Sequence, residues 1–188
     1  MATTMPVTLS PTMADDVRFL CDEMLVGLGR WLRIAGYDTA IADRGRRDRD
    51  LVEQAHAENR VLLTRDRRLV EIRWANDRTI VLEGNGIDAC ARELARRHSL
   101  DWTLDPLSRC TLCNTRLELA DCRLLDSLPL RIRGRGSPVN VCPRCGHLYW
   151  EGSHVPRIRT RLASLACHGA HRDETQATIE LDRPSAPV

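Results

Sequence analysis

The chain has 188 residues, a formal net charge of +2 at pH 7 and eight cysteines. This length allows one medium domain together with a small metal-stabilised module. Every basic residue is arginine, which excludes mechanisms that need a catalytic lysine, such as Schiff-base chemistry and Walker-type phosphate binding. No apolar run is long enough for a membrane span, and residues 1–15 lack the basic start and apolar stretch of a secretory signal. We therefore expect neither a membrane anchor nor secretion.

After residue 15, short apolar strands alternate with amphipathic helices. The expected strands are residues 17–21, 37–42, 61–64 and 79–82. The expected helices are residues 24–35, 48–58, 68–75 and 88–98. This regular alternation predicts an α/β fold, in which an open parallel sheet with right-handed crossovers is flanked by helices.

Capping residue types mark the expected helix ends. Met24 is expected on the apolar face of the first helix, which Gly36 ends because glycine tolerates a left-handed C-terminal cap. Asp48 and Asp88 are expected as N-caps of the second and fourth helices, since a carboxylate accepts hydrogen bonds from the free N–H groups there. A last helix is expected after Pro156, because proline suits a first helical turn.

Four cysteines form two CxxC pairs: Cys110 with Cys113, and Cys142 with Cys145. Two thiolates three positions apart can bind one metal ion from a tight turn, and two such turns complete a tetrahedron around Zn²⁺. Asn114 and Gly146 follow the pairs, and both types tolerate the left-handed backbone that aims N–H groups at the sulfurs. We predict a structural zinc ribbon, because four thiolates leave no open coordination position for chemistry.

These patterns divide the chain into four expected parts: a disordered leader (1–15), an α/β domain (16–107), a zinc ribbon with a terminal helix (108–166) and a disordered tail (167–188). The α/β part carries 16 arginines against 17 acids, whereas the ribbon part carries 10 arginines, Arg131, Arg133 and Arg135 among them, against 4 acids. Nucleic acid is the commonest partner of such a basic segment. The other four cysteines lack pairing spacing, so a reducing cytoplasm fits the chain best.

An acid follows each expected strand of the sheet. These acids are Asp22, Asp43, Asp66 and Glu83, with Asp48 at a nearby helix start. Ligands of open parallel sheets bind beyond the carboxyl ends of the strands. Facing carboxylates repel one another unless a cation neutralises them, and hard oxygen ligands suit Mg²⁺ or Mn²⁺. The pattern predicts a site for metal-assisted phosphodiester cleavage, although any one of these acids alone is typical of a solvated loop or a helix cap.

Several segments, in this order, resemble one known family. They are residues 19–25 (FLCDEML), 29–38 (GRWLRIAGYD), 60–69 (RVLLTRDRRL), the two CxxC turns and residues 149–154 (YWEGSH). Together they resemble the mutator-type C-terminal RNase domain family over about residues 17–165. The resemblance implies a PIN-like nuclease fold with an appended zinc ribbon, and a metal-dependent (endo)ribonuclease with acidic active-site residues. The family usually has alanine where this chain has Gly29.

Carried over residue by residue, the family's catalytic acids fall on Asp22, Asp48 and Asp66. Other acids compete for a place in the site: Asp50, which could replace Asp48, and Glu83 or Asp88 as a fourth acid. By the expected helix and strand positions, Arg30, Arg33 and Arg65 lie near the same edge and could hold the scissile phosphate or the RNA backbone. Surface salt bridges account for these arginines equally well.

The aromatic residues can also be interpreted in two ways, as packing residues or as residues that contact substrate. Trp31 could stack on a base but is more often a core residue. Trp150 and His154 closely follow the ribbon, where they could seal it against the α/β domain or touch substrate.

Three functions follow from these patterns. The first is a cytoplasmic metal-dependent ribonuclease whose ribbon assists RNA binding. The second is an RNA-binding module on a nuclease scaffold with little or no catalysis. The third, a protein-interaction ribbon, explains the zinc but not the acids. The acids favour the first, because a pure RNA binder gains nothing from a centre that repels a polyanion.

Overall fold

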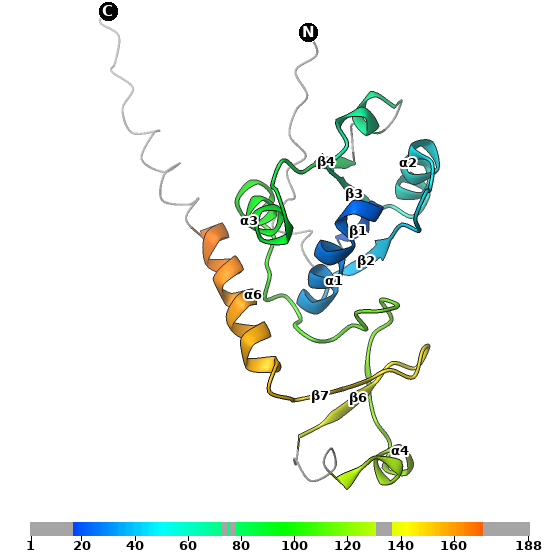
Figure 1. Ribbon diagram of the computed structural model, residues 1–188, viewed down its shortest axis with the longest axis vertical. Coiled ribbons are helices and arrows are strands. Elements are labelled where there is room, and N and C mark those ends of the chain that lie inside the picture. The colour runs from blue at the N-terminus through cyan, green and yellow to red at the C-terminus, as the bar shows by residue number, and fades with distance from the viewer. Residues whose placement is uncertain (1–16, 73–74, 76–77, 131–136, 171–188) are drawn as a thin grey trace, which may run out of the picture.

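The computed structural model describes residues 17–72, 75, 78–130 and 137–170, with side chains described as far as residue 167. The expected leader and the chain after residue 170 lie outside the described residues, as do Arg131, Arg133 and Arg135. Two sheets organise the described part (Figure 1). One belongs to an α/β domain and the other to the ribbon.

The α/β domain contains a parallel sheet with the strand order β2-β1-β3-β4. Its strands are β1 (Arg18–Cys21), β2 (Asp38–Ile41), β3 (Val61–Thr64) and β4 (Thr79–Val81). Its helices are η2 (Glu23–Leu25), α1 (Val26–Ala35), α2 (Asp48–Ala57), η3 (Arg67–Glu71) and α3 (Ile87–His98), with α6 (Val155–Ala170) added from the end of the chain. The predicted α/β architecture with a parallel sheet is confirmed.

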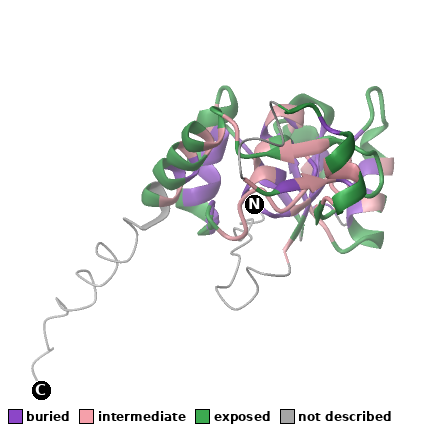
Figure 2. Ribbon diagram, turned by 90° about the horizontal axis from the view of Figure 1, so that it is seen from below, coloured by how far each residue is buried: buried purple, intermediate pink, exposed green. Residues whose placement is uncertain are grey.

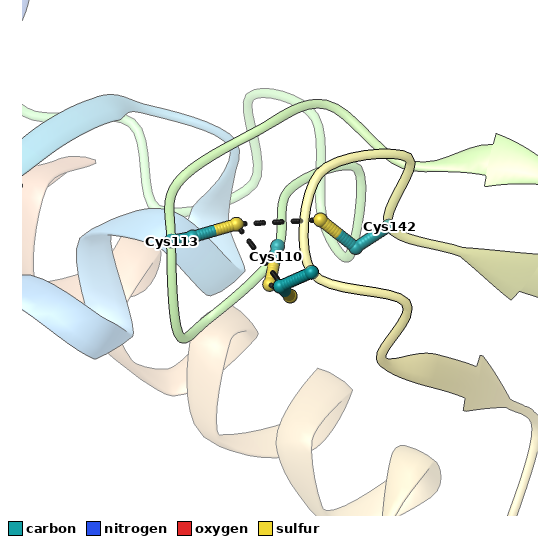
Figure 3. Close-up of side chains that lie close together, drawn as sticks. Cys110, Cys113 and Cys142 are labelled. Carbon is teal, nitrogen blue, oxygen red and sulfur yellow. Dashed lines mark hydrogen bonds between the residues drawn. The ribbon is translucent and has the colours of Figure 1, made fainter.

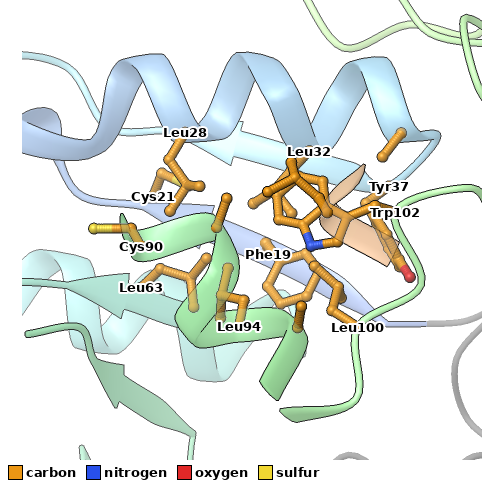
Figure 4. Packing of buried hydrophobic residues seen from close by; sticks show 14 of the residues in the cluster. Phe19, Cys21, Leu28, Leu32, Tyr37, Leu63, Cys90, Leu94, Leu100 and Trp102 are labelled. Atoms are coloured by element: carbon orange, nitrogen blue, oxygen red, sulfur yellow. The ribbon is translucent and has the colours of Figure 1, made fainter. Parts of the chain in front are cut away.

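Alternating residues of the central strands supply two hydrophobic cores, one on each face of the sheet. Phe19, Cys21 and Leu63 pack with residues of α1, α3 and α6 in the larger core. Figure 4 shows the contributions of the strands, α1 and α3 to this core. Leu20 and Leu62 pack with residues of α2 and η3. In Figure 1, α3 and α6 accordingly lie on the opposite side of the sheet from α2. The helices turn their exposed faces outward in Figure 2, so the sheet is covered on both sides.

Several helix ends differ from the sequence-based expectations. Met24 lies in η2, before α1 begins at Val26, and it is 53% exposed. Asp48 is the first residue of α2, and Arg47 occupies the N-cap position. Asp88 likewise lies inside the first turn of α3, after an N-cap at Gly86.

Other boundaries differ by a few residues. The expected helix at 68–75 is a short 3₁₀ segment, η3, whose N-cap is Asp66. The last helix begins at Val155, one residue before Pro156. It continues through Ala170, so residues 167–170, which were expected in the tail, are helical. Gly36 does end α1 in a left-handed conformation with φ of 108°, as expected.

The ribbon contains a three-stranded antiparallel sheet in the order β5-β6-β7. Its elements are β5 (Glu118–Leu119), α4 (Cys122–Ser127), β6 (Val139–Val141) and β7 (Leu148–Trp150). The ribbon joins the α/β domain at the start of β2 and the end of α1, where Asn114 and Arg109 bond to Asp38 and Gly36. Since β1 and β2 run parallel, this junction lies at the amino end of the sheet.

Candidate functional site

Asp22 stands immediately after β1, at the carboxyl edge of the parallel sheet. Its backbone N–H donates to the carbonyl of Leu63 at 3.0 Å, which extends the pairing of β1 with β3 by one residue. Its side chain is buried; Oδ1 accepts from the N–H of Glu23 at 2.6 Å and Oδ2 accepts from the hydroxyl of Thr64 at 2.8 Å. These bonds hold the carboxylate in one orientation.

Thr64, the last residue of β3, connects Asp22 with Asp66. Its fully buried hydroxyl donates to Asp22 and accepts from the backbone N–H of Asp66 at 3.0 Å. Asp66 caps η3, because its Oδ1 accepts from the N–H of Arg68 at 2.9 Å. The two acids therefore follow neighbouring strands and share one hydroxyl as a hydrogen-bonding partner.

The acids at the start of α2 form no hydrogen bond with Asp22, Thr64 or Asp66 among the described residues. Asp48 and Asp50 lie in the first turn of α2, and Asp50 forms an ion pair with Arg47 at 2.9 Å. Hydrogen bonds from Arg47 favour the ionised carboxylate and lower the pKa of Asp50. Asp43 is exposed in the preceding loop. Among the described residues, the acids form no group of three or more close enough to share one ion, so the structure does not bring Asp48 together with both Asp22 and Asp66.

Glu83 follows β4, but its exposed carboxylate pairs with Arg67 at 3.2 Å and with Arg97 at 3.8 Å. Beside it lies Glu93, an acid that the sequence analysis missed. The buried Glu93 carboxylate accepts from the backbone N–H groups of Glu83 and Gly84 at 3.0 and 2.9 Å, and it pairs with Arg97 at 2.8 Å. Glu93 thus fixes the loop that follows β4.

Asp88 and Trp31 take part in contacts between helices. Asp88 on α3 forms an ion pair with Arg161 on α6. The guanidinium carbon of Arg161 lies 4.2 Å from the centre of the Trp31 ring on α1, which is a cation–π geometry. This set ties α1, α3 and α6 together, and it gives both residues a packing role.

The three arginines considered for substrate binding have different environments. Arg30 and Arg65 are exposed, and neither forms an ion pair with a carboxylate in the described part of the chain. Arg33 is buried and donates to the carbonyls of Thr39, Thr111 and Leu112 at 2.8–2.9 Å. The expectation that Arg33 holds a phosphate is wrong for this geometry, because its guanidinium is used within the protein.

The four cysteines of the CxxC pairs form a compact cluster, shown in part in Figure 3. The Sγ atoms of Cys113 and Cys142 are 3.3 Å apart, and Cys145 lies 3.6 Å from Cys110 and 3.7 Å from Cys113. A tetrahedron with Zn–S bonds of about 2.3 Å has edges of about 3.8 Å, so the spacing fits a zinc ion. All four are free thiols, with no disulfide between them.

Backbone geometry around the cysteines follows the expected pattern. Asn114 and Gly146 have φ values of 70° and 71°, in the left-handed region. Their N–H groups donate to the carbonyls of Cys110 and Cys142 at 2.9 Å, which closes both turns. The hydroxyl of Tyr149 lies 3.2 Å from the sulfur of Cys110, so β7 also closes over the cluster.

The thiols of the cluster differ in acidity. Burial opposes ionisation of Cys113, but hydrogen bonding with Thr115 outweighs it and lowers the pKa of this thiol to about 6. The backbone N–H of His147 favours the Cys145 thiolate, yet the neighbouring thiols outweigh it and raise the pKa of Cys145 to about 12. Binding of a divalent cation to all four sulfurs would therefore release protons.

A comparison with protein families agrees with this combination of sites. Residues 17–162 match the family described as "Mut7-C RNAse domain". This chain belongs to that family. The match includes the sheet edge with Asp22 and Asp66 as well as the four-cysteine cluster, and it points to a nuclease-like function. No match was found among curated proteins or among solved structures.

The carboxyl edge of this Mut7-C domain has donors suited to a divalent ion. Asp22 and Asp66 offer carboxylate oxygens, the hard ligands that Mg²⁺ and Mn²⁺ prefer. Within the described residues, Oδ2 of Asp66 accepts no hydrogen bond, so it has coordination capacity left.

The described helices include none with the length and apolar character needed to cross a membrane.

Proposed function

We propose that this protein is a metal-dependent ribonuclease that hydrolyses RNA phosphodiester bonds at the carboxyl edge of the parallel sheet. The observation that carries the proposal is the hydroxyl of Thr64, which bonds to both Asp22 and Asp66. A buried carboxylate held this way is oriented before any substrate arrives, and pre-organisation of this kind is what catalytic groups need. Membership of an RNase domain family supports the reaction class.

Asp22 and Asp66 would bind Mg²⁺ or Mn²⁺, with Asp48 and Asp50 on the adjacent helix as further acids and Glu83 as the acid after β4. Such an ion, when bound, activates water and stabilises the oxygen that leaves the phosphorus. Thr64 orients the Asp22 carboxylate by donating to Oδ2, and the N–H of Glu23 holds Oδ1.

Two exposed arginines are available to hold the RNA. Arg65 directly follows β3 and precedes Asp66, and Arg30 lies on the outer surface of α1. Guanidinium groups bind phosphate oxygens through paired N–H donors. We assign the structural zinc to the four-cysteine cluster, and the basic ribbon to RNA binding. A PIN-like nuclease that acts in the cytoplasm accords with these assignments.

The alternative function is RNA binding with little or no catalysis. It is favoured by one observation, that no three acids in the described part of the chain lie close enough to share one ion. Cleavage by the purified protein separates the two functions.

The test is a single-turnover cleavage assay on a panel of RNAs with saturating Mn²⁺. Asn at positions 22 and 66 keeps the side-chain size but removes a negative ligand, so Asp22→Asn and Asp66→Asn should each lower cleavage by orders of magnitude. RNA affinity should hold or rise, because repulsion of the phosphates falls. The matched control is Asp105→Asn, a half-exposed acid beside the end of α1 and away from this edge, which should leave cleavage unchanged.

Thermal melts show whether each variant is folded. Wild-type rates in a folded Asp22→Asn, Asp66→Asn double variant would contradict catalysis at this edge. Tight RNA binding by the unaltered protein with no cleavage under any divalent ion would favour the alternative.

A further inference from the structure

A pocket of about 480 Å³ lies where the ribbon meets the α/β domain. One wall comes from the end of α1 and the segment after α3, through Ile34 and Leu107. The opposite wall comes from β7 and the start of α6, through Leu148, Trp150 and Ile158. Polar groups reach the same pocket: Asn140, His154 and Arg159 are the side chains most useful for recognition.

This pocket is remote from the catalytic acids. It contains Ile34, near the carboxyl end of α1, whereas Asp22 lies just before the start of that helix. A ten-residue helix such as α1 is about 15 Å long, at 1.5 Å per residue. A ligand in the pocket therefore contacts a different part of the protein from a phosphate at Asp22 and Asp66.

We propose that this pocket binds an unpaired nucleobase of the RNA substrate, with Trp150 as the stacking surface. The inference rests on the proposed ribonuclease function and adds a second contact point for the same RNA. The RNA strand would pass from the acidic edge along the molecule to the ribbon, and one base would enter the pocket.

Trp150 has the exposure that such a role needs. It is a large apolar side chain at 39% exposure on an edge strand of the ribbon sheet. Its neighbour Tyr149 is occupied differently, since its hydroxyl accepts from the N–H of Thr111 at 3.0 Å and lies against the sulfur of Cys110. Trp150 is thus the aromatic ring of this pocket that remains open to a ligand.

The lining also matches the chemistry of a nucleobase. A base has apolar faces and polar edges, which correspond to the apolar walls and to the amide of Asn140 and the imidazole of His154. The stacking face and the Watson–Crick edge of a base are accessible together only when the base is unpaired and unstacked, so the pocket predicts selectivity for unpaired RNA.

Charge favours a polyanion over other occupants of this surface. Helix α6 carries three arginines and no acid. One acid does line the pocket, Glu151, and Arg159 pairs with it at 3.5 Å. In sequence, residues 108–166 carry 10 arginines against 4 acids, so the segment that supplies most of the pocket is one that attracts phosphates.

The experiment measures RNA affinity in the Asp22→Asn background, so that cleavage does not interfere. Two probes are compared by fluorescence anisotropy: a single-stranded oligoribonucleotide and a strand of the same length without bases. Trp150→Ala should weaken binding of the base-containing strand by about tenfold, as expected for the loss of one base–aromatic stack. Binding of the base-free strand should not change.

Salt dependence separates stacking from phosphate contacts. Trp150→Ala should leave the slope of log K against log salt unchanged, because loss of a stacked ring releases no counterions. Trp150→Phe should keep most of the affinity, because a ring remains. Leu119→Ala is the matched control, since Leu119 is an exposed apolar residue of the same ribbon sheet outside the pocket.

Zinc content and thermal melts show that each variant is folded. A second measurement keeps Trp150 in place. In NMR spectra, its indole N–H resonance should shift on addition of the base-containing strand and should not shift on addition of the base-free strand. If Trp150→Ala in the Asp22→Asn background binds the base-containing strand as tightly as Asp22→Asn itself, the proposed base-binding pocket is overturned. An equal loss of affinity for both probes would overturn it too. Neither result would contradict the proposed ribonuclease function. Failure of the unaltered protein to bind any RNA would instead contradict the proposed function.

Discussion

Arg33 on α1 donates from Nη1 to the carbonyl of Thr111, inside the first CxxC turn, at 2.9 Å. The same nitrogen donates to Leu112 at 2.8 Å, and Nε donates to Thr39 on β2 at 2.8 Å. One buried guanidinium therefore joins a helix and a strand of the α/β domain to the first CxxC turn. Asn114 adds to this junction by accepting from the N–H of Thr39 and donating to Asp38. The ribbon and the α/β domain should consequently unfold together.

Replacement of Arg33 tests this junction. Arg33→Met keeps the apolar stem but leaves the carbonyls of Thr39, Thr111 and Leu112 without their charged donor, so it should lower the free energy of unfolding by about 3 kcal/mol. Chemical denaturation followed by circular dichroism measures the change. Arg30→Met is the matched control, because Arg30 lies one turn earlier on α1 with an exposed side chain. Similar losses in the two variants would show that the junction contributes nothing beyond helix stability.

Zinc should be a structural element of the ribbon. Cys110→Ser removes one thiolate of the cluster, so it should release the metal and lower the melting temperature, since structural zinc typically contributes about 10 kcal/mol or more to small modules. Elemental analysis and thermal melts measure both effects. Cys122→Ser, at an exposed cysteine of α4 outside the cluster, should leave both unchanged. Absence of zinc from the unaltered protein purified without chelator would overturn this prediction.

The parallel sheet and the cysteine cluster could be predicted because both depend on local sequence. Strand–helix alternation places Asp22 and Asp66 after strands without any knowledge of packing. The CxxC spacing places Cys110 and Cys113 in one turn in the same way. The sheet and the cysteine cluster were therefore predicted correctly, because each is determined by residues that are close together in the sequence.

Features that depend on docking between distant segments were not recovered. Arg33 has an arginine's usual preference for the surface, and only the arrival of the ribbon some 80 positions later covers it and supplies two of its carbonyl partners. Glu93 lies beside apolar Leu94 in α3, and only the loop after β4 explains its burial. A charged residue directly adjacent to core positions is the signal that could have indicated both. Met24 was misplaced because the helical pattern was extended across the 3₁₀ turn at η2.

Thr64 should act by positioning the catalytic acids. Thr64→Val removes the hydroxyl that serves both Asp22 and Asp66, so cleavage should fall by about a hundredfold, as expected for a small misplacement of a catalytic group. Thr64→Ser keeps the hydroxyl and should restore most of the rate. Thr79→Val controls for the change of a buried threonine on the neighbouring strand, and it should leave the rate unaffected. A Thr64→Val rate equal to that of Thr64→Ser would show that the shared hydrogen bonds are dispensable.

Stability should depend on pH through Asp38, at the start of β2. Burial raises the pKa of this carboxyl, but hydrogen bonds from Arg60 at 2.6 Å and Asn114 at 2.8 Å outweigh it and place the pKa below its ordinary value. A lowered folded-state pKa gives stability that is complete above the unfolded-state pKa of about 4, and that is lost as the pH falls through that value and then through the folded-state pKa. Asp38→Asn cannot titrate and lacks this contribution at every pH.

The measurement is the difference in free energy of unfolding between the unaltered protein and Asp38→Asn, followed from neutral pH into acid. At neutral pH the variant should be less stable by about 2 kcal/mol, the scale of hydrogen bonds to a charged group. The difference should narrow as the pH falls below about 4, because the native carboxyl then becomes protonated as well. Comparison of the two proteins at each pH cancels the acid sensitivity of the cysteine cluster, which both contain. Asp50→Asn is the control, since its partner Arg47 is exposed and the pair contributes little. A difference that stays constant from neutral to acid pH would show that Arg60 and Asn114 do not stabilise the ionised form of Asp38.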